Sequence, residues 1–251
     1  YNTPYTILML DLRCNALCLF CNVPEESCGT QSLTTREAKN KITALLKKNK
    51  DLRLDISGGE PTLRPDLPEI VGYASKQGVK TIQIQTNAIK LADRSLVRQL
   101  KKSGLRKAFV ALHSHRAPIH DMMTEHRGAF KKCTQGIKHL LRAGIRVSLN
   151  PVITRFNAAS MPHYPAFLKK MFTKPIESIS LSVVQPYGRA LLNPAMVPTY
   201  GEISFFIQAT IKAAEARHIP INNPYCGAPL CVGSWYRALN RCVEYHMSPD
   251  A

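Results

Sequence analysis

No stretch of the sequence is apolar enough to cross a membrane, because no hydrophobic run approaches the roughly 18 residues that a membrane helix requires. The sequence also lacks the charged, apolar and small-residue order of a signal peptide. It begins with Tyr1 rather than methionine, which allows for a chain trimmed at its start. From these two absences we expect a soluble, cytoplasmic protein with no membrane partner, and 251 residues, 45% of them hydrophobic, are enough to bury a real core.

Acidic residues are scarce: 17 Asp and Glu stand against 34 Lys and Arg, which gives a formal net charge of +17. Such a charge attracts polyanions, so it fits a nucleic acid, an acidic peptide or an anionic cofactor. The basic residues nevertheless form short scattered runs, with no aromatic residues between them to stack on bases. A solvated surface explains the charge better, and a nucleic-acid partner stays open.

Eight cysteines stand out against this background, and most of them cluster. Because a reducing cytosol disfavours disulfides, we interpret the clustered cysteines as ligands. Cys133 falls on a helical apolar stripe and is assigned to the core. A tetrahedral structural zinc needs four ligands, so the three thiols of CNALCLFC, residues 14–21, leave one coordination position unfilled. The two groups are Cys14, Cys18 and Cys21, and Cys226, Cys231 and Cys242.

Short apolar or alternating runs recur along the chain, each followed by a helical pattern. Their length of about seven residues and their β-branched content predict strands. The clearest helix is expected at 34–48, where Thr34 and Glu37 make a capping box. Others are expected from about Gly128, and from about Gly201 to Ala216. The six expected strands are 6–12, 52–58, 81–87, 107–113, 146–153 and 178–184.

Six strand–helix units imply right-handed crossovers and a parallel sheet. Six are too few for a closed eight-stranded barrel. The predicted fold class is therefore α/β, a partial (β/α)6 barrel of parallel strands over residues 1–190, followed at 191–251 by a helix and a small cysteine-rich extension. Functional residues of such sheets lie where strands end. These ends carry the first cysteine group, Ser57–Pro61, Thr86–Ala88, His113–His115, Asn150 and Gln185–Ala190.

Two of these segments resemble motifs of the radical SAM enzymes. CNALCLFC matches their C-x3-C-x2-C signature, and GGEP, residues 58–61, follows the second strand as their second motif does. The resemblance covers about residues 5–190, and it implies that Cys14, Cys18 and Cys21 hold a [4Fe-4S] cluster whose open iron binds S-adenosylmethionine. It also implies an enzyme that reductively cleaves S-adenosylmethionine to a 5'-deoxyadenosyl radical, which abstracts a substrate hydrogen.

The resemblance further assigns residues to the S-adenosylmethionine site. Gly58 and Gly59 let the backbone approach the methionine end closely, Glu60 supplies an anionic acceptor, and Pro61 stiffens the turn. Phe20 matches an aromatic residue against the adenine. Polar positions at the ends of the third to fifth strands have an alternative as turn or strand-end residues. These are Thr86, Asn87, Ser114 and Asn150. No general acid or base is identified.

The carboxyl-terminal cysteines resemble the Twitch or SPASM extension of some radical SAM enzymes, which holds an auxiliary iron–sulfur cluster. The spacing leaves the cluster type and the fourth ligand open, with Cys28 or a residue beyond Ala251 as candidates. A zinc knuckle or structural thiols are the alternative. The extension is similar to that of peptide-modifying maturases. This implies a peptide or protein substrate and a reducing electron donor of the flavodoxin or ferredoxin type.

Other functions stay open from the sequence. A nucleotide or RNA substrate is the main rival within the enzyme class, and the basic charge supports it. A non-catalytic module would hold zinc with Cys14, Cys18, Cys21 and Cys28, although GGEP beside them argues against it. An iron–sulfur scaffold would deliver clusters without cleaving S-adenosylmethionine.

Overall fold

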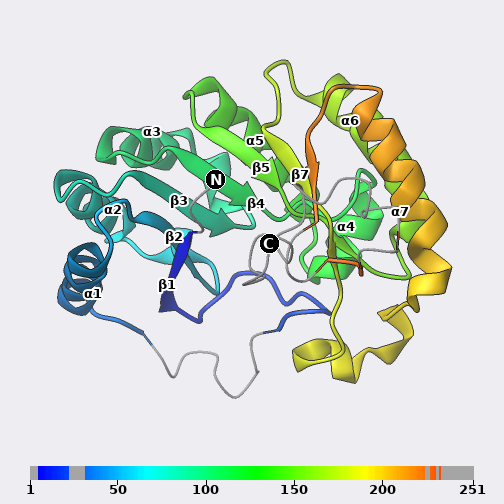
Figure 1. The fold of residues 1–251 in the computed structure, drawn as a ribbon, viewed down its shortest axis with the longest axis horizontal. Helices are drawn as coiled ribbons and strands as arrows, with labels where there is room; N and C mark the ends of the chain where they lie inside the picture. Colours follow the sequence, from blue (N-terminus) through cyan, green and yellow to red (C-terminus); the bar gives the residue numbers. More distant parts are fainter. Residues whose placement is uncertain (1–4, 23–31, 224–226, 230–231, 233–251) are drawn as a thin grey trace, which may run out of the picture. The chain divides into compact units, whose positions relative to one another are not determined.

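The computed structural model describes residues 5–22, 32–223, 227–229 and 232. The chain, drawn as a ribbon in Figure 1, divides into two compact units by its internal contacts. No helix within the described part of the chain is both long and apolar enough to span a membrane. The first unit contains Tyr1–Leu17, Val23–Val110 and Lys131–Val147, and the second contains Cys18–Asn22, Ala111–Phe130 and Ser148–Ala251.

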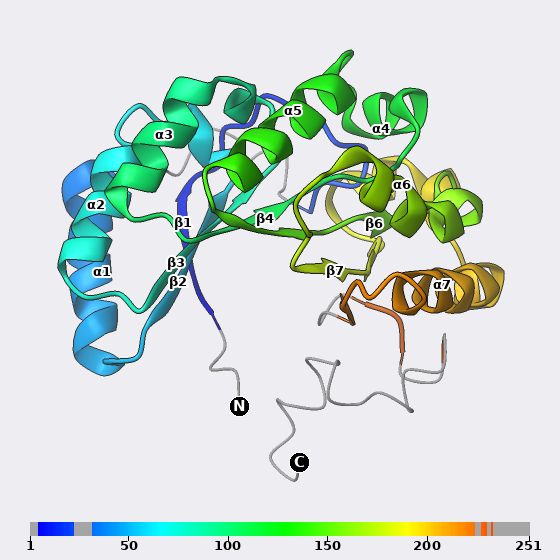
Figure 2. The ribbon, with the colours of Figure 1, turned by 90° about the horizontal axis from the view of Figure 1, so that it is seen from above.

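The first unit is a parallel sheet with helices along it. Its strands pair in the order β1 (Thr6–Asp11), β2 (Arg53–Gly58), β3 (Thr81–Thr86) and β4 (Lys107–Val110). Figure 2 shows helices along one side of these strands. They are α1 (Thr35–Lys48), α2 (Leu67–Lys76) and α3 (Arg94–Ser103), and the short 3-10 helices η2 (Pro61–Leu63) and η3 (Lys90–Ala92) lie between them in the chain.

The alternation of apolar and polar side chains along β2 shows which face of this sheet packs into the core. Leu54 and Ile56 of β2 are fully buried, and Asp55 between them belongs to the opposite face because successive side chains alternate. The helices contribute their own apolar positions, such as the fully buried Ile42 of α1. Apolar residues thus gather on the helical side, and polar ones lie on the other face.

The second unit has shorter strands. β5 (Arg146–Leu149) pairs with β7 (Ser178–Ser180), which pairs with β9 (Ile221–Asn222), and β6 (Val152–Ile153) pairs with β8 (Ser182–Val183), all in parallel. Both α5 (Ala129–Arg142) and β5 have residues in the two units. The remaining elements are α4 (Ala117–Thr124), η4 (Ala158–His163), α6 (Tyr164–Met171), η5 (Gly188–Leu192), η6 (Pro194–Met196) and α7 (Tyr200–Glu215).

The parallel pairings confirm the predicted α/β class. The capping box is also confirmed, because the Thr34 side chain accepts from Glu37 N–H and the Glu37 side chain accepts from Thr34 N–H. The runs 146–153 and 178–184 each form two short strands instead of one. In the former, Pro151 has no N–H to donate to a ladder. β9 lies outside the six predicted strands, since two residues are too short a run to show alternation.

Candidate functional site

The cysteine segment, residues 11–22, begins at the last residue of β1 and carries the first cysteine group. Cys14 is exposed and belongs to the first unit, whereas Cys18 and Cys21 are half-buried and belong to the second. Three accessible, soft sulfur donors within eight residues fit an iron–sulfur cluster chemically. Among the described residues, no three His, Cys, Asp or Glu side chains form a ready site for a single metal ion.

Cys133 provides the contrast. It is fully buried in α5, and burial raises the pKa of its thiol, so it is inert as a ligand. Its assignment to the core is confirmed. The predicted ligands Cys226, Cys231 and Cys242, with the candidate Cys28, lie outside the described residues.

Two glycines let the GGEP motif lie against the start of the cysteine segment, within the first unit. The Gly59 N–H donates to the Asp11 carbonyl oxygen at 2.7 Å, and the Glu60 N–H donates to the Arg13 carbonyl oxygen at 2.8 Å. A Cβ on Gly58 would collide with the Asp11 carbonyl oxygen, and a Cβ on Gly59 would collide with that of Arg13. Both positions therefore require glycine for the approach of one motif to the other.

The Glu60 carboxylate is buried, with only 2% of the residue exposed, and it accepts four hydrogen bonds. Its Oε1 accepts from the N–H and hydroxyl of Thr62 and from the Thr86 hydroxyl, while Oε2 accepts from the Asn87 N–H at 2.7 Å. Burial raises the pKa of this carboxyl, and the hydrogen bonds oppose the rise. Glu60 thus ties η2, which begins at Pro61, to the end of β3.

Asn87 connects this network to Cys14. Its Nδ2 donates to Asn15 Oδ1 at 2.7 Å and lies 3.8 Å from Cys14 Sγ, and its Oδ1 accepts from the Ile89 N–H at 3.0 Å. The next residue, Ala88, has a φ of 59°, which turns the chain sharply after β3. The first unit therefore brings together Cys14, Gly58, Gly59, Glu60, Pro61, Thr86 and Asn87.

Phe20 packs on histidines of the second unit. Its ring lies edge-on to His113 with centroids 4.7 Å apart, and His113 stacks on His120 at 5.5 Å. The Val152 N–H donates to His113 Nδ1, and the His113 N–H donates to His120 Nδ1. Burial lowers the pKa of His113, and it lowers the pKa of His120 to about 4. Both rings are therefore neutral acceptors that support Phe20.

Ser114 makes a local hydrogen bond in the second unit, and Asn150 makes one with a residue that begins β8. The buried Ser114 hydroxyl accepts from the Arg116 N–H at 3.0 Å, and Asn150 Oδ1 accepts from the Ser182 hydroxyl at 2.6 Å. Both interactions are of the turn and strand-end kind that the sequence leaves as the alternative. Their contact with S-adenosylmethionine stays a prediction.

Asn157 is a supporting residue that the sequence analysis misses. It is fully buried, and its Nδ2 donates to the carbonyl oxygens of His113 at 2.7 Å and Val152 at 2.8 Å. Its Oδ1 accepts from the Thr154 N–H at 2.8 Å. This Thr-x-x-Asn turn is the local signal by which Asn157 can be recognised.

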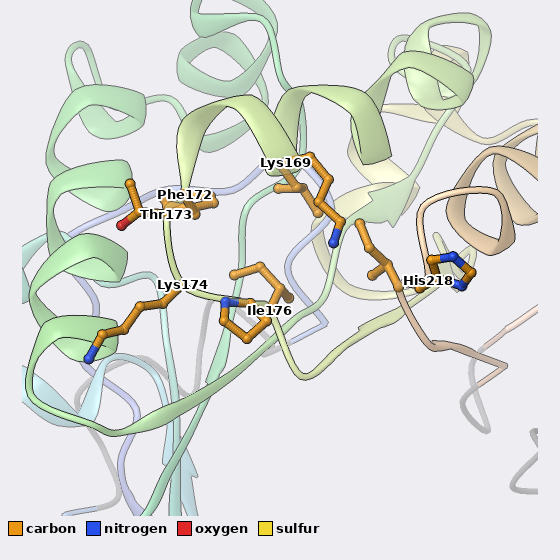
Figure 3. Close-up of a pocket in the computed structure, with 9 residues that line it drawn as sticks. Lys169, Phe172, Thr173, Lys174, Ile176 and His218 are labelled. Atoms are coloured by element: carbon orange, nitrogen blue, oxygen red, sulfur yellow. The ribbon is translucent and has the colours of Figure 1, made fainter.

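A hollow of about 250 Å³ in the second unit contains none of the predicted site residues (Figure 3). Lysines and a histidine lie among its apolar side chains, and in Figure 3 Lys174 extends away from His218. It is lined by Leu168, Lys169, Phe172, Thr173, Lys174, Pro175, Ile176, His218 and Ile219.

A family model described as the radical SAM superfamily matches residues 12–163. This range contains both sequence motifs, the first cysteine group and GGEP at 58–61. The cofactors of this family are a [4Fe-4S] cluster and S-adenosylmethionine.

Curated relatives are similar over much of the chain. The Fe-coproporphyrin III synthase of Methanosarcina barkeri is 32% identical over 63% of the chain, and a probable GTP 3',8-cyclase of Sulfolobus acidocaldarius is 31% identical over 72%. The PqqA peptide cyclase of Rhodopseudomonas palustris is 29% identical over 94%. The chain spans 39%, 56% and 64% of these three proteins, respectively.

Solved structures share the fold. Streptococcus suis SuiB bound to the precursor peptide SuiA matches with a TM-score of 0.70 at 16% identity, covering 93% of this chain and 51% of that one. Native anSMEcpe with bound AdoMet matches with a TM-score of 0.70 at 14% identity, covering 87% of this chain and 64% of that one. The likeness confirms the partial barrel of parallel strands.

Proposed function

The chain belongs to the radical SAM superfamily, and from this premise we propose that it is an enzyme that reductively cleaves S-adenosylmethionine and modifies a peptide or protein side chain. When bound, the cluster and S-adenosylmethionine supply an electron to the sulfonium bond and a 5'-deoxyadenosyl radical that abstracts a substrate hydrogen. The residues of this chain bind, orient and shield these groups.

The junction between the two motifs carries the proposal. Two main-chain hydrogen bonds, from Gly59 to Asp11 and from Glu60 to Arg13, fix the backbone just before Cys14. The Asn87 amide, 3.8 Å from Cys14 Sγ, adds a donor that favours the thiolate over the thiol. A turn with no partner would not need glycines at both contact points.

The residue roles follow from this junction. Cys14, Cys18 and Cys21 would hold the cluster, and the backbone of residues 58–61 would bind the methionine end of S-adenosylmethionine. A flavodoxin- or ferredoxin-type donor would supply the electron, and Cys226, Cys231 and Cys242 in residues 191–251 would hold an auxiliary cluster. The side chains assigned to S-adenosylmethionine are Phe20, Glu60, Thr86, Asn87, Ser114 and Asn150.

A peptide substrate has the broader support. The relative named as a PqqA peptide cyclase aligns with 94% of this chain, and the structure with a bound precursor peptide covers 93%. A nucleotide is the second candidate, since a probable GTP 3',8-cyclase is 31% identical and the net charge of +17 suits an anionic substrate.

The first test is anaerobic reconstitution with iron and sulfide, followed by reduction and an assay for 5'-deoxyadenosine. We expect product from the wild type, no product and less bound iron than the wild type in Cys18→Ala, and retained product in Cys231→Ala. Cys133→Ala is the matched control, because it removes one thiol from the core and leaves the motif intact.

If the reduced, iron-loaded wild type forms no product, either with or without candidate substrates, the proposed enzyme activity is wrong and a cluster scaffold is favoured. Substrate class is tested by adding acidic synthetic peptides or GTP to this assay. A peptide that raises 5'-deoxyadenosine formation and acquires a mass change supports the proposal. Stimulation by GTP alone, with binding that weakens steeply with salt, contradicts the peptide assignment.

A further inference from the structure

Arg189, at the start of η5, contacts the main chain of the cysteine segment within the second unit. Its N–H donates to the Cys21 carbonyl oxygen at 2.9 Å, and its Nη1 donates to the Cys18 carbonyl oxygen at 3.4 Å. Its Nη2 forms an ion pair with the Glu125 carboxylate at 2.8 Å. The Arg189 side chain is 17% exposed and that of Glu125 is 41% exposed, so the cation is the better shielded partner.

Neighbouring residues reinforce this contact. The Asn193 Nδ2 donates to the Leu19 carbonyl oxygen at 3.3 Å, and the Leu19 N–H donates to the Met123 carbonyl oxygen at 3.0 Å. Gly188 has a φ of 60°, and a Cβ there would collide with the Cys21 carbonyl oxygen. Residues 188–193 therefore contact three carbonyl groups between Cys18 and Cys21.

The positive charge of Arg189 would also affect the redox state of a cluster bound to Cys18 and Cys21. A guanidinium keeps its positive charge at any working pH, and a shielded charge is screened less by water and salt than an exposed one. Net charge and hydrogen bonds near the ligands set the reduction potential of an iron–sulfur cluster, because its reduced form carries one more negative charge. A cation beside Cys18 favours the reduced form, and the Glu125 carboxylate opposes that effect.

We propose that Arg189 is a positioning residue that holds Cys18 and Cys21 in their loop, and that the Arg189–Glu125 ion pair sets the reduction potential of the cluster bound there. The inference rests on the cluster-binding role proposed above for this loop. It assigns a function to two residues that neither ligate iron nor belong to either sequence motif.

The chain provides a matched control in another Arg–Glu pair of the second unit. Arg155 forms an ion pair with Glu202 at 3.1 Å and donates to the Ala195 carbonyl oxygen at 2.9 Å. The chemistry is the same, but these hydrogen bonds do not involve the cysteine segment.

The experiment compares wild type, Arg189→Met, Arg189→Lys, Glu125→Gln and Arg155→Met after anaerobic reconstitution. Bound iron is measured first, and the midpoint potential is then determined by redox titration followed by electron paramagnetic resonance. We expect a more negative potential in Arg189→Met, a more positive one in Glu125→Gln, and wild-type potentials in Arg189→Lys and Arg155→Met. Loss of iron to a chelator is expected to be about tenfold faster in Arg189→Met, because a charged hydrogen bond is lost.

Circular dichroism melts identify variants that fail to fold, and Glu125→Gln, which leaves Arg189 and its hydrogen bonds to the loop intact, tests the potential even if Arg189→Met unfolds. Potentials of Arg189→Met and Glu125→Gln that equal the wild type, or that move in the same direction, overturn the inference. A wild type that takes up no cluster fails the proposed function instead, so the two failures are distinguishable.

Discussion

The two regions that carry the first cysteine group are held by side chains of opposite hydrogen-bonding kind, an acceptor in one and a donor in the other. In the first unit the buried carboxyl group of Glu60 accepts hydrogen bonds from hydroxyls and main-chain N–H groups, and the neutral amide of Asn87 lies next to Cys14. In the second unit a cation, Arg189, donates to the carbonyl oxygens of Cys18 and Cys21.

The difference follows from the main-chain group that each region presents to a side chain, an N–H in one and carbonyl oxygens in the other. The turn after β3 presents the Asn87 N–H, which the Glu60 carboxyl group accepts, whereas the cysteine segment presents carbonyl oxygens, which Arg189 and Asn193 satisfy as donors. A carboxyl acceptor and a guanidinium donor therefore perform the same task, and the two regions are expected to respond differently to substitution and to pH.

The largest effect is expected from Gly59→Ala, which removes the contact that the first region depends on. The new Cβ collides with the Arg13 carbonyl oxygen, and relieving the collision breaks main-chain hydrogen bonds to the cysteine segment. We expect the free energy of unfolding to fall by about 4 kcal/mol in a urea titration. Gly72→Ala in α2 is the control, because its Cβ meets only ordinary contacts, and the helix gains up to ~1 kcal/mol. Equal stabilities of the two variants contradict the prediction.

The next largest effect is expected in the second unit, where His120→Gln changes how the free energy of unfolding depends on pH. Burial lowers the pKa of His120 from 6.5 to about 4, so the unfolded chain binds the proton more tightly and stability is lost as the pH falls through this window. Over this range we expect the wild type to lose about 3 kcal/mol more than His120→Gln, measured by urea unfolding at several pH values. His218→Gln, which removes an exposed imidazole, is the control substitution. Parallel wild-type and His120→Gln profiles would falsify the assignment.

Glu60→Gln probes the first region with the smallest expected effect and the opposite dependence on pH. Burial raises the pKa of Glu60 above 4.5, so its contribution to stability is full below that pH and is lost as the pH rises through the raised value. In Glu60→Gln the side-chain amide directs an N–H toward groups that are themselves donors. We expect the free energy of unfolding to be about 1–2 kcal/mol lower than that of the wild type at acid pH, and the difference to shrink toward neutral pH. Thermal melts at each pH measure it, with the exposed Glu69→Gln as control. A cost that grows with pH contradicts this account.

Local patterns are what the sequence predicts well here. The capping box at Thr34 and Glu37, the buried stripe with Cys133 and the alternation of β3 all depend on residues close in the chain. The partners of Glu60 and Arg189 lie as many as 27 and 171 positions away, so neither spacing nor propensity indicates them. β9 escapes prediction for the same reason, because only its pairing with β7 makes two residues a strand.

The distance in sequence between the cysteine segment and residues 188–193 also sets an order of events during synthesis. The hydrogen bonds from Arg189 to Cys18 and from Asn193 to Leu19 span 171 and 174 positions. Because a chain leaves the ribosome from its amino end, Cys18 and Cys21 emerge well before residues 188–193, which hold them. In the cell, stable iron insertion at this segment is therefore expected only after residues 188–193 have been synthesised.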